Sequence, residues 1–419
     1  MLEPVTKPVG RPLVTAVTGT NGKTSVATAT LQLLRAAGMR AAGCDSTGIT
    51  DVHGAVRPAQ FRRSAQFLPD LIEEQVALGA EAISLEAFVG ILKDGLLEHV
   101  EVDVAVCTGL ERDHLDVHGS LEQYWGAKLR LFEEHLRPDG VAVLATDCAQ
   151  GDLVRDAAAR RGARLVTVGR GGDVELEAAR ELAAAAGADD GAPAGDGGTA
   201  AASGAEDGDR DGRLRGVLRV GARRFPVVLP TVHGVAATNL LLSASAVIGL
   251  GAAPEAVAVA LAEVSPPPGR LEVVGHRGGV AAMVDTAHNP AALRAALTAV
   301  RARTSARVLL VVGAGGERDR AKRAPMGEVA AELADLVILT DDNPRREPPA
   351  RIRADIRAGC PDCIEIPRRA EAIRAAWEMA REGDVVLVAG KGDETVQLVA
   401  GRRLPHDDRA VLRELLART

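Results

Sequence analysis

The chain has 419 residues, enough for two or three domains, and 47% of them are apolar, so large cores can form. Only 2% of the residues are aromatic and the net charge is −7 without a dense basic stripe, which argues against nucleic acid as a partner. Neither a run of about 18 apolar residues nor a signal-peptide core is present, so we expect a cytoplasmic protein that does not contact membranes.

The first predicted strand, 14–17, runs into a glycine turn, 18–22, and then into a helix that reaches residue 37. This order is the context of a phosphate-binding loop, in which glycines let backbone N–H groups approach phosphate oxygens and the helix N-terminus adds positive partial charge. Lys23 would neutralise phosphate charge and the Thr24 hydroxyl would bind Mg²⁺. The predicted phosphate-binding residues are Gly19, Thr20, Asn21, Gly22, Lys23, Thr24 and Ser25. The alternative is a chance Gly/Thr turn.

Strands and helices alternate after this loop, which is typical of a mostly parallel sheet covered by helices. The expected helices are 69–78, 121–136 and 153–161, and the expected strands are 82–85, 102–107, 141–145 and 164–168. From about 187 to 212 the sequence has almost no large apolar residues, so we expect a disordered surface insertion. A hairpin of 214–220 and 224–229 and two helices, 237–248 and 254–264, complete this part.

A Pro-rich segment, Pro266–Arg270, predicts a stiff linker and a domain boundary. Beyond it, strands are expected at 280–285, 308–312, 336–340 and 385–389, and helices at 290–303, 326–334, 351–358 and 370–381. We therefore predict an α/β protein with a P-loop mononucleotide-binding central domain over 1–265 and a C-terminal Rossmann-like α/β domain over 269–419.

Five cysteines form no disulfide framework. The pair Cys360 and Cys363 is a lone CxxC without a second pair or a histidine at zinc spacing, so we interpret both as loop residues.

Candidate metal ligands follow two of the predicted strands. Phosphate chemistry needs Mg²⁺, which prefers oxygen ligands. Glu86 comes just after one apolar strand and His114, within Asp113–Asp116, follows another, where the carboxyl ends of parallel strands build clefts. Lys128 lies on the next helix. Taken separately, each of these residues would be interpreted as structural.

Together these segments resemble the Mur ligase superfamily, which contains cell-wall peptide ligases, folylpolyglutamate synthetases and cyanophycin synthetases. The loop GTNGKTS resembles its ATP loop, and TGLERDHLDVHGSLEQYWGAKLRLF (108–132) is similar to its middle domain. The resemblance implies catalytic Lys23, Glu86, His114 and Lys128, and a metal held by Thr24, Glu86, His114 and Lys128. It also implies a carbamate on Lys128, because a free ammonium beside Mg²⁺ would be repelled. The alternative is a surface lysine on an amphipathic helix.

Three further segments resemble the superfamily's nucleotide-contacting motifs. Segment 233–239 keeps only the terminal Asn239 of an HNxxN motif, which would touch the adenine. Arg270 lies in a GRxE-like turn and would reach the ATP phosphates. Asp285 and His288 lie in a DxxHNP motif, and the context agrees, because a strand ends at Asp285 and a helix begins at Pro290.

The C-terminal half is most similar to the muramoyl-tripeptide synthetase branch. The run 313–326 matches GxGGxRDxxKRxxM, 342–345 matches DNPR, and 389–394 resembles GKGHE with Asp393 in place of His. In that branch the DNPR motif goes with meso-diaminopimelate as the incoming amino acid. An arginine fork binds a carboxylate and a glutamate binds an ammonium, so together they suit a zwitterionic side-chain end. The resemblance implies an amino-acid pocket of Arg318, Asn343, Arg345, Gly390 and Glu394. The alternative is a simple turn with solvated arginines.

Three features depart from that branch. Its ATP loop follows a UDP-sugar-binding domain, whereas here the loop starts at residue 18. The acceptor segment near 57–66 is RPAQFRRSAQ, in which Arg57, Arg62 and Arg63 would bind another acid's carboxylate or form a solvated loop. The EVSSH motif is replaced at 85–90, where EAFVGILKDGL is closer to cyanophycin synthetases. We therefore expect an acid without a UDP-sugar; the alternative is a UDP-muramoyl peptide.

The resemblance thus predicts an ADP-forming carboxylate–amine ligase that uses ATP and Mg²⁺. The acid attacks the γ-phosphate, the acyl phosphate is shielded from water by the second domain, and an amine then forms the amide. The expected partners are small-molecule acid and amino-acid substrates, and the protein is expected to be a monomer or homodimer. The alternatives from other classes are a P-loop regulatory protein without ligase activity and a nucleoside kinase.

Overall fold

The computed structural model describes residues 3–59, 64–111, 120–148, 150–178, 213–230 and 234–418. Its contacts divide the chain into two compact units, the first of Met1–Glu111 and Trp125–Ser265 and the second of Arg112–Tyr124 and Pro266–Thr419. The predicted insertion at 187–212 lies outside the described residues. In the part of the chain that the structure describes, no helix is long and apolar enough to cross a membrane.

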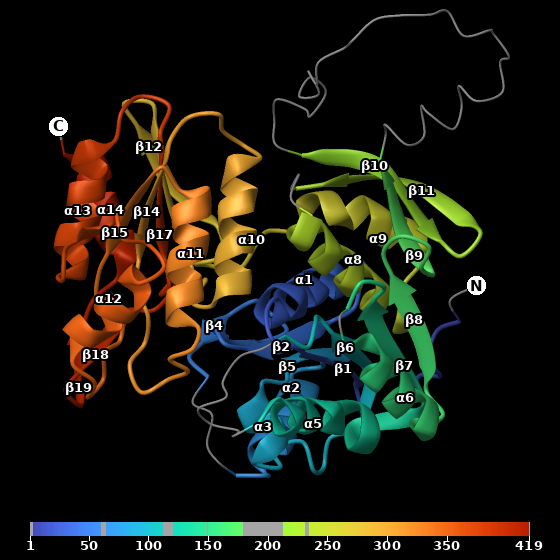
Figure 1. Ribbon diagram of the computed structural model, residues 1–419. Coiled ribbons are helices and arrows are strands. Elements are labelled where there is room, and N and C mark those ends of the chain that lie inside the picture. Colours follow the sequence, from blue (N-terminus) through green and yellow to red (C-terminus); the bar gives the residue numbers. More distant parts are fainter. Residues whose placement is uncertain are drawn as a thin grey trace, which may run out of the picture. The chain divides into compact units, whose positions relative to one another are not determined.

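A large mixed sheet forms the centre of the first unit (Figure 1), with the strand order β11-β10-β9-β8-β7-β6-β1-β5-β2-β3-β4. All pairings from β9 to β2 are parallel, as predicted, and the strands at both edges are antiparallel. The strands are β1 (Leu13–Thr18), β2 (Ala41–Asp45), β3 (Gly48–Thr50), β4 (Val56–Arg57), β5 (Ala82–Glu86), β6 (Val102–Cys107), β7 (Leu136–Ala145), β8 (Arg164–Val168), β9 (Val174–Ala178), β10 (Leu214–Val220) and β11 (Arg223–Leu229). The predicted hairpin corresponds to β10 and β11.

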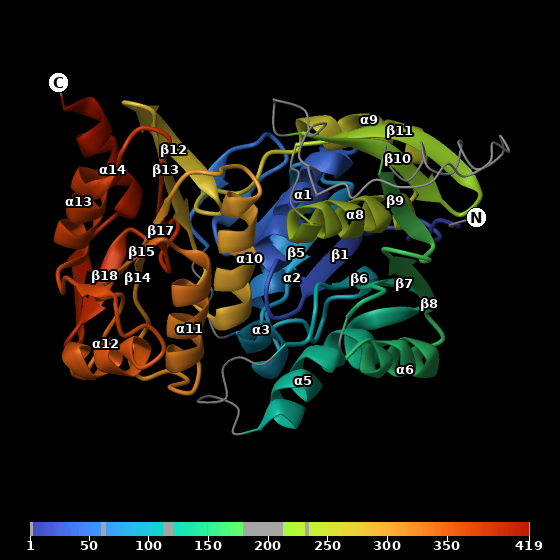
Figure 2. The ribbon, with the colours of Figure 1, turned by 45° about the horizontal axis from the view of Figure 1, so that its top comes forward.

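Helices cover both faces of this sheet, so its central strands are buried on both sides. One apolar cluster packs α1 (Lys23–Ala36), α8 (Gly234–Gly249) and α9 (Pro254–Ala260) on one face, where α1 and α8 lie side by side (Figure 2). A short 3₁₀ helix, η3 (Leu261–Glu263), follows α9. A second cluster packs the other face under α2 (Phe67–Ala77), α3 (Val89–Lys93), α5 (Leu121–Arg130) and α6 (Gly151–Arg161).

The single helix predicted over 121–136 is wrong in its last turn. The α-helix ends at Arg130, a π-helical turn η1 (Leu131–His135) follows, and β7 begins at Leu136. The side chains of Leu131, Phe132 and Leu136 are all fully buried. The α-helix ends here because packing buries these apolar side chains and pairs Leu136 with Val102 of β6. These tertiary contacts outweigh the helical pattern of the sequence.

The second unit has its own sheet, with the order β12-β13-β17-β14-β15-β16. All its pairings are parallel except that of β12 with β13, so the predicted Rossmann-like α/β architecture is confirmed. Its strands are β12 (Glu272–Arg277), β13 (Val280–Asp285), β14 (Val308–Val312), β15 (Leu336–Leu339), β16 (Ile364–Glu365) and β17 (Val385–Ala389), beside a small hairpin of β18 (Val396–Val399) and β19 (Arg402–Pro405).

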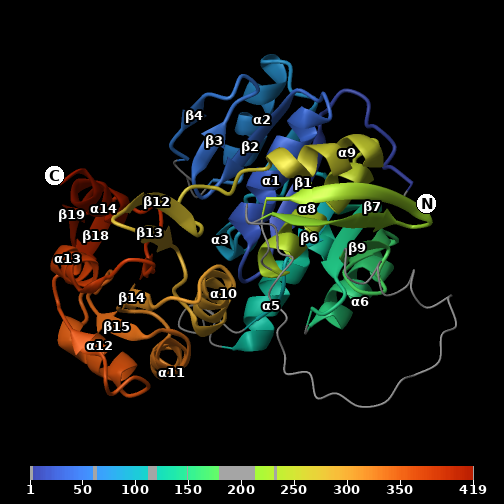
Figure 3. The ribbon, with the colours of Figure 1, turned by 90° about the horizontal axis from the view of Figure 1, so that it is seen from above.

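Two helical layers enclose this second sheet (Figure 3). One face carries α10 (Pro290–Arg301), α11 (Arg323–Leu333) and α12 (Pro349–Arg357), and the other carries α13 (Arg369–Met379) and α14 (Asp408–Ala417). Helix α10 begins at Pro290, as predicted, and Asn289 caps it by accepting a 2.9 Å hydrogen bond from the Ala292 N–H.

One buried carboxylate fixes the start of β1, the strand that leads into the nucleotide loop. The side chain of Asp103 is 0% exposed and accepts hydrogen bonds from Arg11 Nη1 at 2.7 Å, Arg137 Nη1 at 2.9 Å and the Val14 N–H at 2.8 Å. We predict that Asp103→Ala lowers the free energy of unfolding by about 3 kcal/mol, because two arginines lose a buried partner. Urea unfolding measures this loss.

The matched control is Asp139→Ala, since Asp139 also pairs with Arg137 but has a side chain that is 56% exposed. We expect this control to lose less than about 1 kcal/mol. Equal losses for the two variants would contradict a special role of Asp103.

Candidate nucleotide and amino-acid sites

The predicted nucleotide loop lies between the end of β1 and the start of α1. Gly19 and Gly22 have φ angles of 142° and 83°, which favour glycine. A Cβ at Gly22 would lie 2.8 Å from Asn239 Oδ1, so the loop leaves no room for a side chain there. Helix α1 has no acidic residue in its first turn and no side-chain cap, so its first N–H groups are suited to an anion.

Two lysines from different helices meet at Thr20. Lys23 Nζ donates to the Thr20 carbonyl oxygen at 2.9 Å, and Lys128 Nζ donates to Thr20 Oγ1 at 3.2 Å. Lys128 is only 2% exposed, so the alternative of a surface lysine is wrong. The fold therefore brings these two predicted catalytic residues together, against the same loop residue.

Oxygen atoms gather at the first turn of α1, where the metal was predicted. Glu86, the last residue of β5, is 4% exposed, and its Oε2 accepts hydrogen bonds from Thr24 Oγ1 at 2.9 Å and the Ser46 N–H at 3.0 Å. Ser46 Oγ also lies 2.9 Å from Thr24 Oγ1. Sequence reasoning missed Ser46; its only signal was the polar Asp-Ser-Thr run after β2, a strand that the pattern did not reveal.

This oxygen set fits a hard divalent cation, because Mg²⁺ takes hydroxyl and carboxylate oxygens. The predicted ligand His114 lies outside the described residues. Among those that are described, no three His, Cys, Asp or Glu side chains form a metal site by themselves. The hydroxyls of Thr24 and Ser46 with the Glu86 carboxylate are therefore the groups that would hold the cation.

The segment after β6, residues 108–111, braces the loop from the side. The Thr108 N–H donates to the Thr18 carbonyl at 3.0 Å, and the Thr20 N–H donates to the Gly109 carbonyl at 2.8 Å. Glu111 Oε2 accepts a 2.7 Å hydrogen bond from Asn21 Nδ2. The sequence resemblance included this segment without indicating its bracing role, because pairing between strands far apart in the chain has no local signal.

In the second unit the predicted nucleotide-contacting residues gather around Thr286. Arg270 Nη1 donates to Thr286 Oγ1, and His288 Nδ1 lies 2.7 Å from the Thr286 carbonyl oxygen. Asp285 accepts the N–H groups of Leu271 and Ala287, both at 2.8 Å, and burial raises its pKa. The buried Asp285 carboxylate thus joins the linker turn to the end of β13.

The predicted amino-acid residues also come together, at the carboxyl ends of β14, β15 and β17. Asn343 Nδ2 donates to Glu394 Oε2 at 2.9 Å, and the fully buried Lys391 donates from Nζ to Glu394 Oε2 at 2.7 Å and to Asn343 Oδ1 at 3.0 Å. The sequence analysis assigned no role to Lys391, although it lies inside segment 389–394, which resembles GKGHE. A Cβ at Gly390 would lie 2.6 Å from Asp342 Oδ2, so the DNPR turn and this loop touch.

Both predicted arginines lie beside the glycine loop that follows β14. Arg345 adopts a left-handed φ of 54° and donates from Nη1 to the Gly316 carbonyl at 2.7 Å. A Cβ at Gly315 would lie 2.9 Å from Arg345 Nη1 and 3.6 Å from Arg318 Cγ, so both side chains flank this glycine. Burial and the charge of Arg318 lower the pKa of Arg345. Two guanidinium groups this close suit an anionic ligand group.

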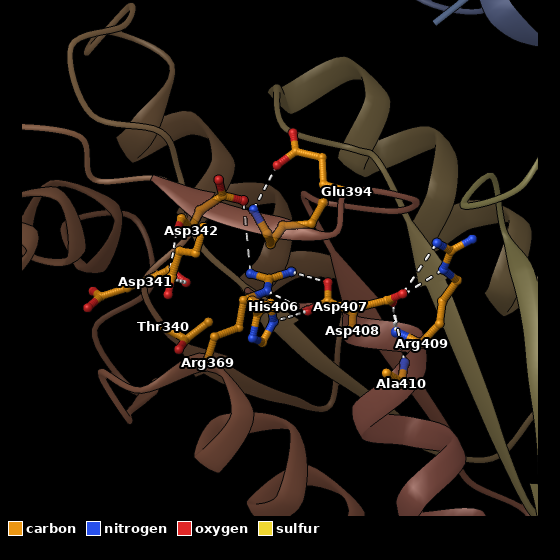
Figure 4. A network of polar contacts seen from close by, with 12 residues as sticks. Thr340, Asp341, Asp342, Arg369, Glu394, His406, Asp407, Asp408, Arg409 and Ala410 are labelled. Atoms are coloured by element: carbon orange, nitrogen blue, oxygen red, sulfur yellow. Dashed lines mark hydrogen bonds and ion pairs between the residues drawn. The ribbon is translucent and has the colours of Figure 1, made fainter. Parts of the chain in front are cut away.

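A buried network supports this site from behind (Figure 4). Arg369 and Asp408 are both fully buried and form a bidentate pair at 2.8 and 2.7 Å. Arg369 Nη2 also donates to the Ala389 carbonyl at 2.8 Å, directly before Gly390. Burial opposes ionisation of Asp408, but Arg369 and His406 hold its pKa well below the usual value.

Comparison with known families gives two matches that cover most of the chain. Residues 17–190 match the model described as "Mur ligase middle domain". Residues 269–392 match the model described as "Mur ligase, glutamate ligase domain".

Curated relatives are similar over nearly the whole chain. A protein of Bradyrhizobium diazoefficiens named UDP-N-acetylmuramoyl-L-alanyl-D-glutamate–2,6-diaminopimelate ligase is 38% identical over 404 residues, which cover 96% of this chain and 79% of the relative. A protein of Alkalilimnicola ehrlichii with the same name is 40% identical over 422 residues, which cover 98% of this chain and 77% of the relative.

Solved structures show the same fold. A structure of a UDP-N-acetylmuramoyl-L-alanyl-D-glutamate–2,6-diaminopimelate ligase matches with a TM-score of 0.62 and 30% identity, covering 97% of this chain and 78% of that one. Mycobacterium tuberculosis folylpolyglutamate synthase, solved with ADP and AMPPCP, matches with a TM-score of 0.68 over 98% of this chain and 92% of its own; at 18% identity this shows the fold alone.

The loop that carries Arg318 depends on one ion pair whose pH response can be measured. Arg323, fully buried, donates to both oxygens of Glu347 at 2.7 Å, and Glu347 Oε2 also accepts the Glu317 N–H at 3.1 Å. The Arg323 hydrogen bonds lower the pKa of Glu347 from 4.5 to about 2. A carboxylate with a lowered pKa stabilises the fold above its unfolded pKa and loses that contribution as pH falls through the folded pKa.

We therefore predict that Glu347→Gln lowers stability by about 3 kcal/mol at pH 7. The difference from the native chain should shrink as pH falls from 4.5 toward 2, as measured by urea midpoints. Glu332→Gln is the control, because Glu332 pairs with Arg294 while its side chain stays 55% exposed. A deficit that stays constant down to pH 3 would contradict the prediction.

Proposed function

The chain belongs to the Mur ligase family of ATP-dependent, ADP-forming amide ligases, and we propose that it joins a diamino dicarboxylic acid such as 2,6-diaminopimelate to an acid acceptor. The single observation that carries this proposal is the juxtaposition of Asn343, Lys391 and Glu394 in the second unit. Both curated relatives described above carry 2,6-diaminopimelate in their names.

The cluster has complementary groups for a zwitterionic side-chain end. Glu394 is 46% exposed while its Oε2 is fixed by Asn343 and Lys391, so its exposed part would receive an ammonium. Arg318 and Arg345, beside Gly315, would bind the neighbouring carboxylate. A diamino dicarboxylic acid supplies both charges at one end and leaves the reacting amine at the other.

For the acid, the names of the relatives favour UDP-N-acetylmuramoyl-L-alanyl-D-glutamate, and we propose it as the first substrate to test. The hypothesis of an acid without a UDP-sugar gains no support from these names. It stays a second candidate, for which a cavity of about 530 Å³ between β3, β4 and α2 has the size of a small-molecule site. It is lined by Ile49, Arg57, Pro58, Ser64, Phe67, Asp70, Leu71 and Glu74. Arg62 and Arg63 lie outside the described residues.

The chain's own residues divide the work of the reaction. When bound, ATP supplies the phosphoryl group that activates the acid, and a divalent cation neutralises phosphate charge. The N–H groups of Gly22 to Thr24 would bind phosphate oxygens, with Lys23 moving from the Thr20 carbonyl to the phosphates. Glu86 orients the Thr24 hydroxyl by accepting a 2.9 Å hydrogen bond from it at Oε2. Asn239, Arg270, Asp285 and His288 would contribute the remaining nucleotide contacts.

An ADP-release assay tests this function. The acids are UDP-N-acetylmuramoyl-L-alanyl-D-glutamate, the free dipeptide and small mono- and dicarboxylic acids, each offered with diaminopimelate, lysine, ornithine or arginine. We expect ADP release that requires both an acid and diaminopimelate. Glu394→Gln should raise the KM for the amino acid by about 10- to 100-fold, the value of one charged hydrogen bond, without changing the KM for ATP.

The matched control is Glu371→Gln, because Glu371 lies on α13 in the same unit and its side chain is 53% exposed in a surface pair with Arg368. It should leave both KM values unchanged. ADP release that ignores the amino acid, or that is equal with lysine and diaminopimelate, would count against the proposed amine.

Lys128 provides a separate prediction, since its buried ammonium contacts Thr20 of the nucleotide loop. Reaction of its neutral amine with CO₂ would give a carbamate and release a proton, replacing a repelled cation by an oxygen ligand. We predict that Lys128→Ala lowers kcat by at least about 100-fold and that formate or acetate partly restores it. Lys93→Ala, on a helix end of the same unit, is the control. Unchanged activity, or no rescue by any short carboxylate, would exclude the carbamate.

A further inference from the structure

The small hairpin of β18 and β19 lies against the DNPR turn, residues 342–345, which follows β15 as irregular backbone. Arg345 and Val399 form an isolated parallel bridge. The Arg345 N–H donates to the Leu398 carbonyl at 2.9 Å, and the Arg345 carbonyl accepts the Ala400 N–H at 2.5 Å. Irregular backbone has to find partners for its polar groups elsewhere, and here the hairpin supplies them.

Gln397 of β18 adds a side-chain contact to the same turn. Its Nε2 donates to the Asp342 carbonyl at 2.7 Å and to the Asp341 carbonyl at 3.3 Å. A glutamine amide carries two N–H donors, so one side chain can serve both carbonyls. These carbonyls belong to the two residues directly before Asn343, and the half-buried Gln397 therefore holds the backbone that leads into Asn343.

The hairpin also decides which way the Asn343 amide faces. Asn343 Oδ1 accepts the Leu398 N–H at 2.9 Å and the Lys391 ammonium at 3.0 Å. A backbone N–H and an ammonium can only donate, so the amide oxygen has to face both of them. The amide nitrogen is thereby directed to Glu394, where it donates to Oε2 at 2.9 Å. The orientation of Asn343 toward Glu394 thus depends on a backbone N–H of β18.

Arg345 adopts a backbone conformation that needs this support. Its φ of 54° lies in the left-handed region, where the Cβ of a residue other than glycine is crowded. Such a conformation persists only where the surroundings hold it, and here the hairpin bonds both the N–H and the carbonyl of Arg345. In this conformation the side chain donates from Nη1 to the Gly316 carbonyl at 2.7 Å. The direction of the guanidinium therefore depends on the hairpin as well.

We propose that the β18–β19 hairpin determines the specificity of the amino-acid site and that Gln397 is a positioning residue within it. This inference rests on the proposed function, since the hairpin acts on residues assigned to the amine substrate and not on the substrate itself. It acts through Asn343, whose amide holds Glu394 for the ammonium, and through Arg345, whose guanidinium would bind the carboxylate. One hairpin thus sets both groups that distinguish a zwitterionic side-chain end from a simple amine.

The test measures ADP release by the full chain at saturating ATP and acid, with the concentration of diaminopimelate varied. Gln397→Met keeps the length of the side chain but removes the donor to the Asp342 carbonyl. We expect the KM for diaminopimelate to rise about 3- to 10-fold, the value of one neutral hydrogen bond. The kcat should stay within about twofold and the KM for ATP should not change. Gln397→Glu, which places an oxygen against the same carbonyl, should raise the KM for diaminopimelate further.

Arg403→Met is the matched control, because Arg403 is exposed on β19 as the register partner of Leu398. This control should keep all native kinetic constants, and urea midpoints of all variants show whether any of them has lost its fold. A folded Gln397→Met chain with the native KM for diaminopimelate, or with KM values for ATP and diaminopimelate that rise together, would overturn the proposal. The native chain is measured first; if no pair of acid and amine gives ADP release, it is the proposed function that fails, and this role with it.

Discussion

The hydrogen bonds of the Glu86 carboxylate are the contacts on which the nucleotide site depends. Glu86 ends β5, and its one oxygen Oε2 joins Thr24 at the first turn of α1 to Ser46 in the turn after β2. These three positions are adjacent because β1, β5 and β2 are parallel and end at the same edge of the sheet. A carboxylate that is 4% exposed is costly to bury, so it stays in place only with donors around it. The oxygens that would hold a cation are thereby positioned by the protein itself.

In the second unit a buried ammonium, in place of a buried carboxylate, holds the surrounding side chains in position. Lys391 is fully buried at the end of β17, and its ammonium joins Asn343 of the DNPR turn to Glu394. Removing one partner of a buried ion pair of this kind is costly, but replacing both partners by apolar residues can be neutral, because desolvation offsets the attraction. What they provide is geometry: Arg369 holds the Ala389 carbonyl, and the Arg323–Glu347 pair holds the loop of Glu317. The residues of the proposed amino-acid site are therefore held in place by neighbouring buried charged groups.

Much of this architecture could be predicted from the sequence, for identifiable reasons. Central parallel strands such as 308–312 are continuous apolar runs, and the glycine turn before a helix is typical of a phosphate-binding loop. The edge strands β4 and β16, and β3 next to β4, were missed because they are only two or three residues long. The π-helical turn at 131–135 was missed because it follows from packing. Ser46 and Lys391 were missed as site residues for a related reason, since their roles come from partners that are distant in the chain.

The charge balance of the amino-acid cluster narrows the choice of amine. The cluster holds three cations, Arg318, Arg345 and Lys391. The charges of Asp342 and Glu394 act on Arg345, and Lys391 already neutralises part of the Glu394 charge. A side chain that ends in a lone ammonium, such as that of lysine, would gain one partly neutralised carboxylate and meet two arginines. A side chain that ends in an ammonium and a carboxylate brings an anion for those arginines and leaves the local net charge unchanged. Since like charges placed together cost several kcal/mol in a partly desolvated site, the arginines of the proposed site would act chiefly by excluding the monocationic competitor. Selectivity between these amines would thus rest on Arg318 and Arg345 as much as on Glu394.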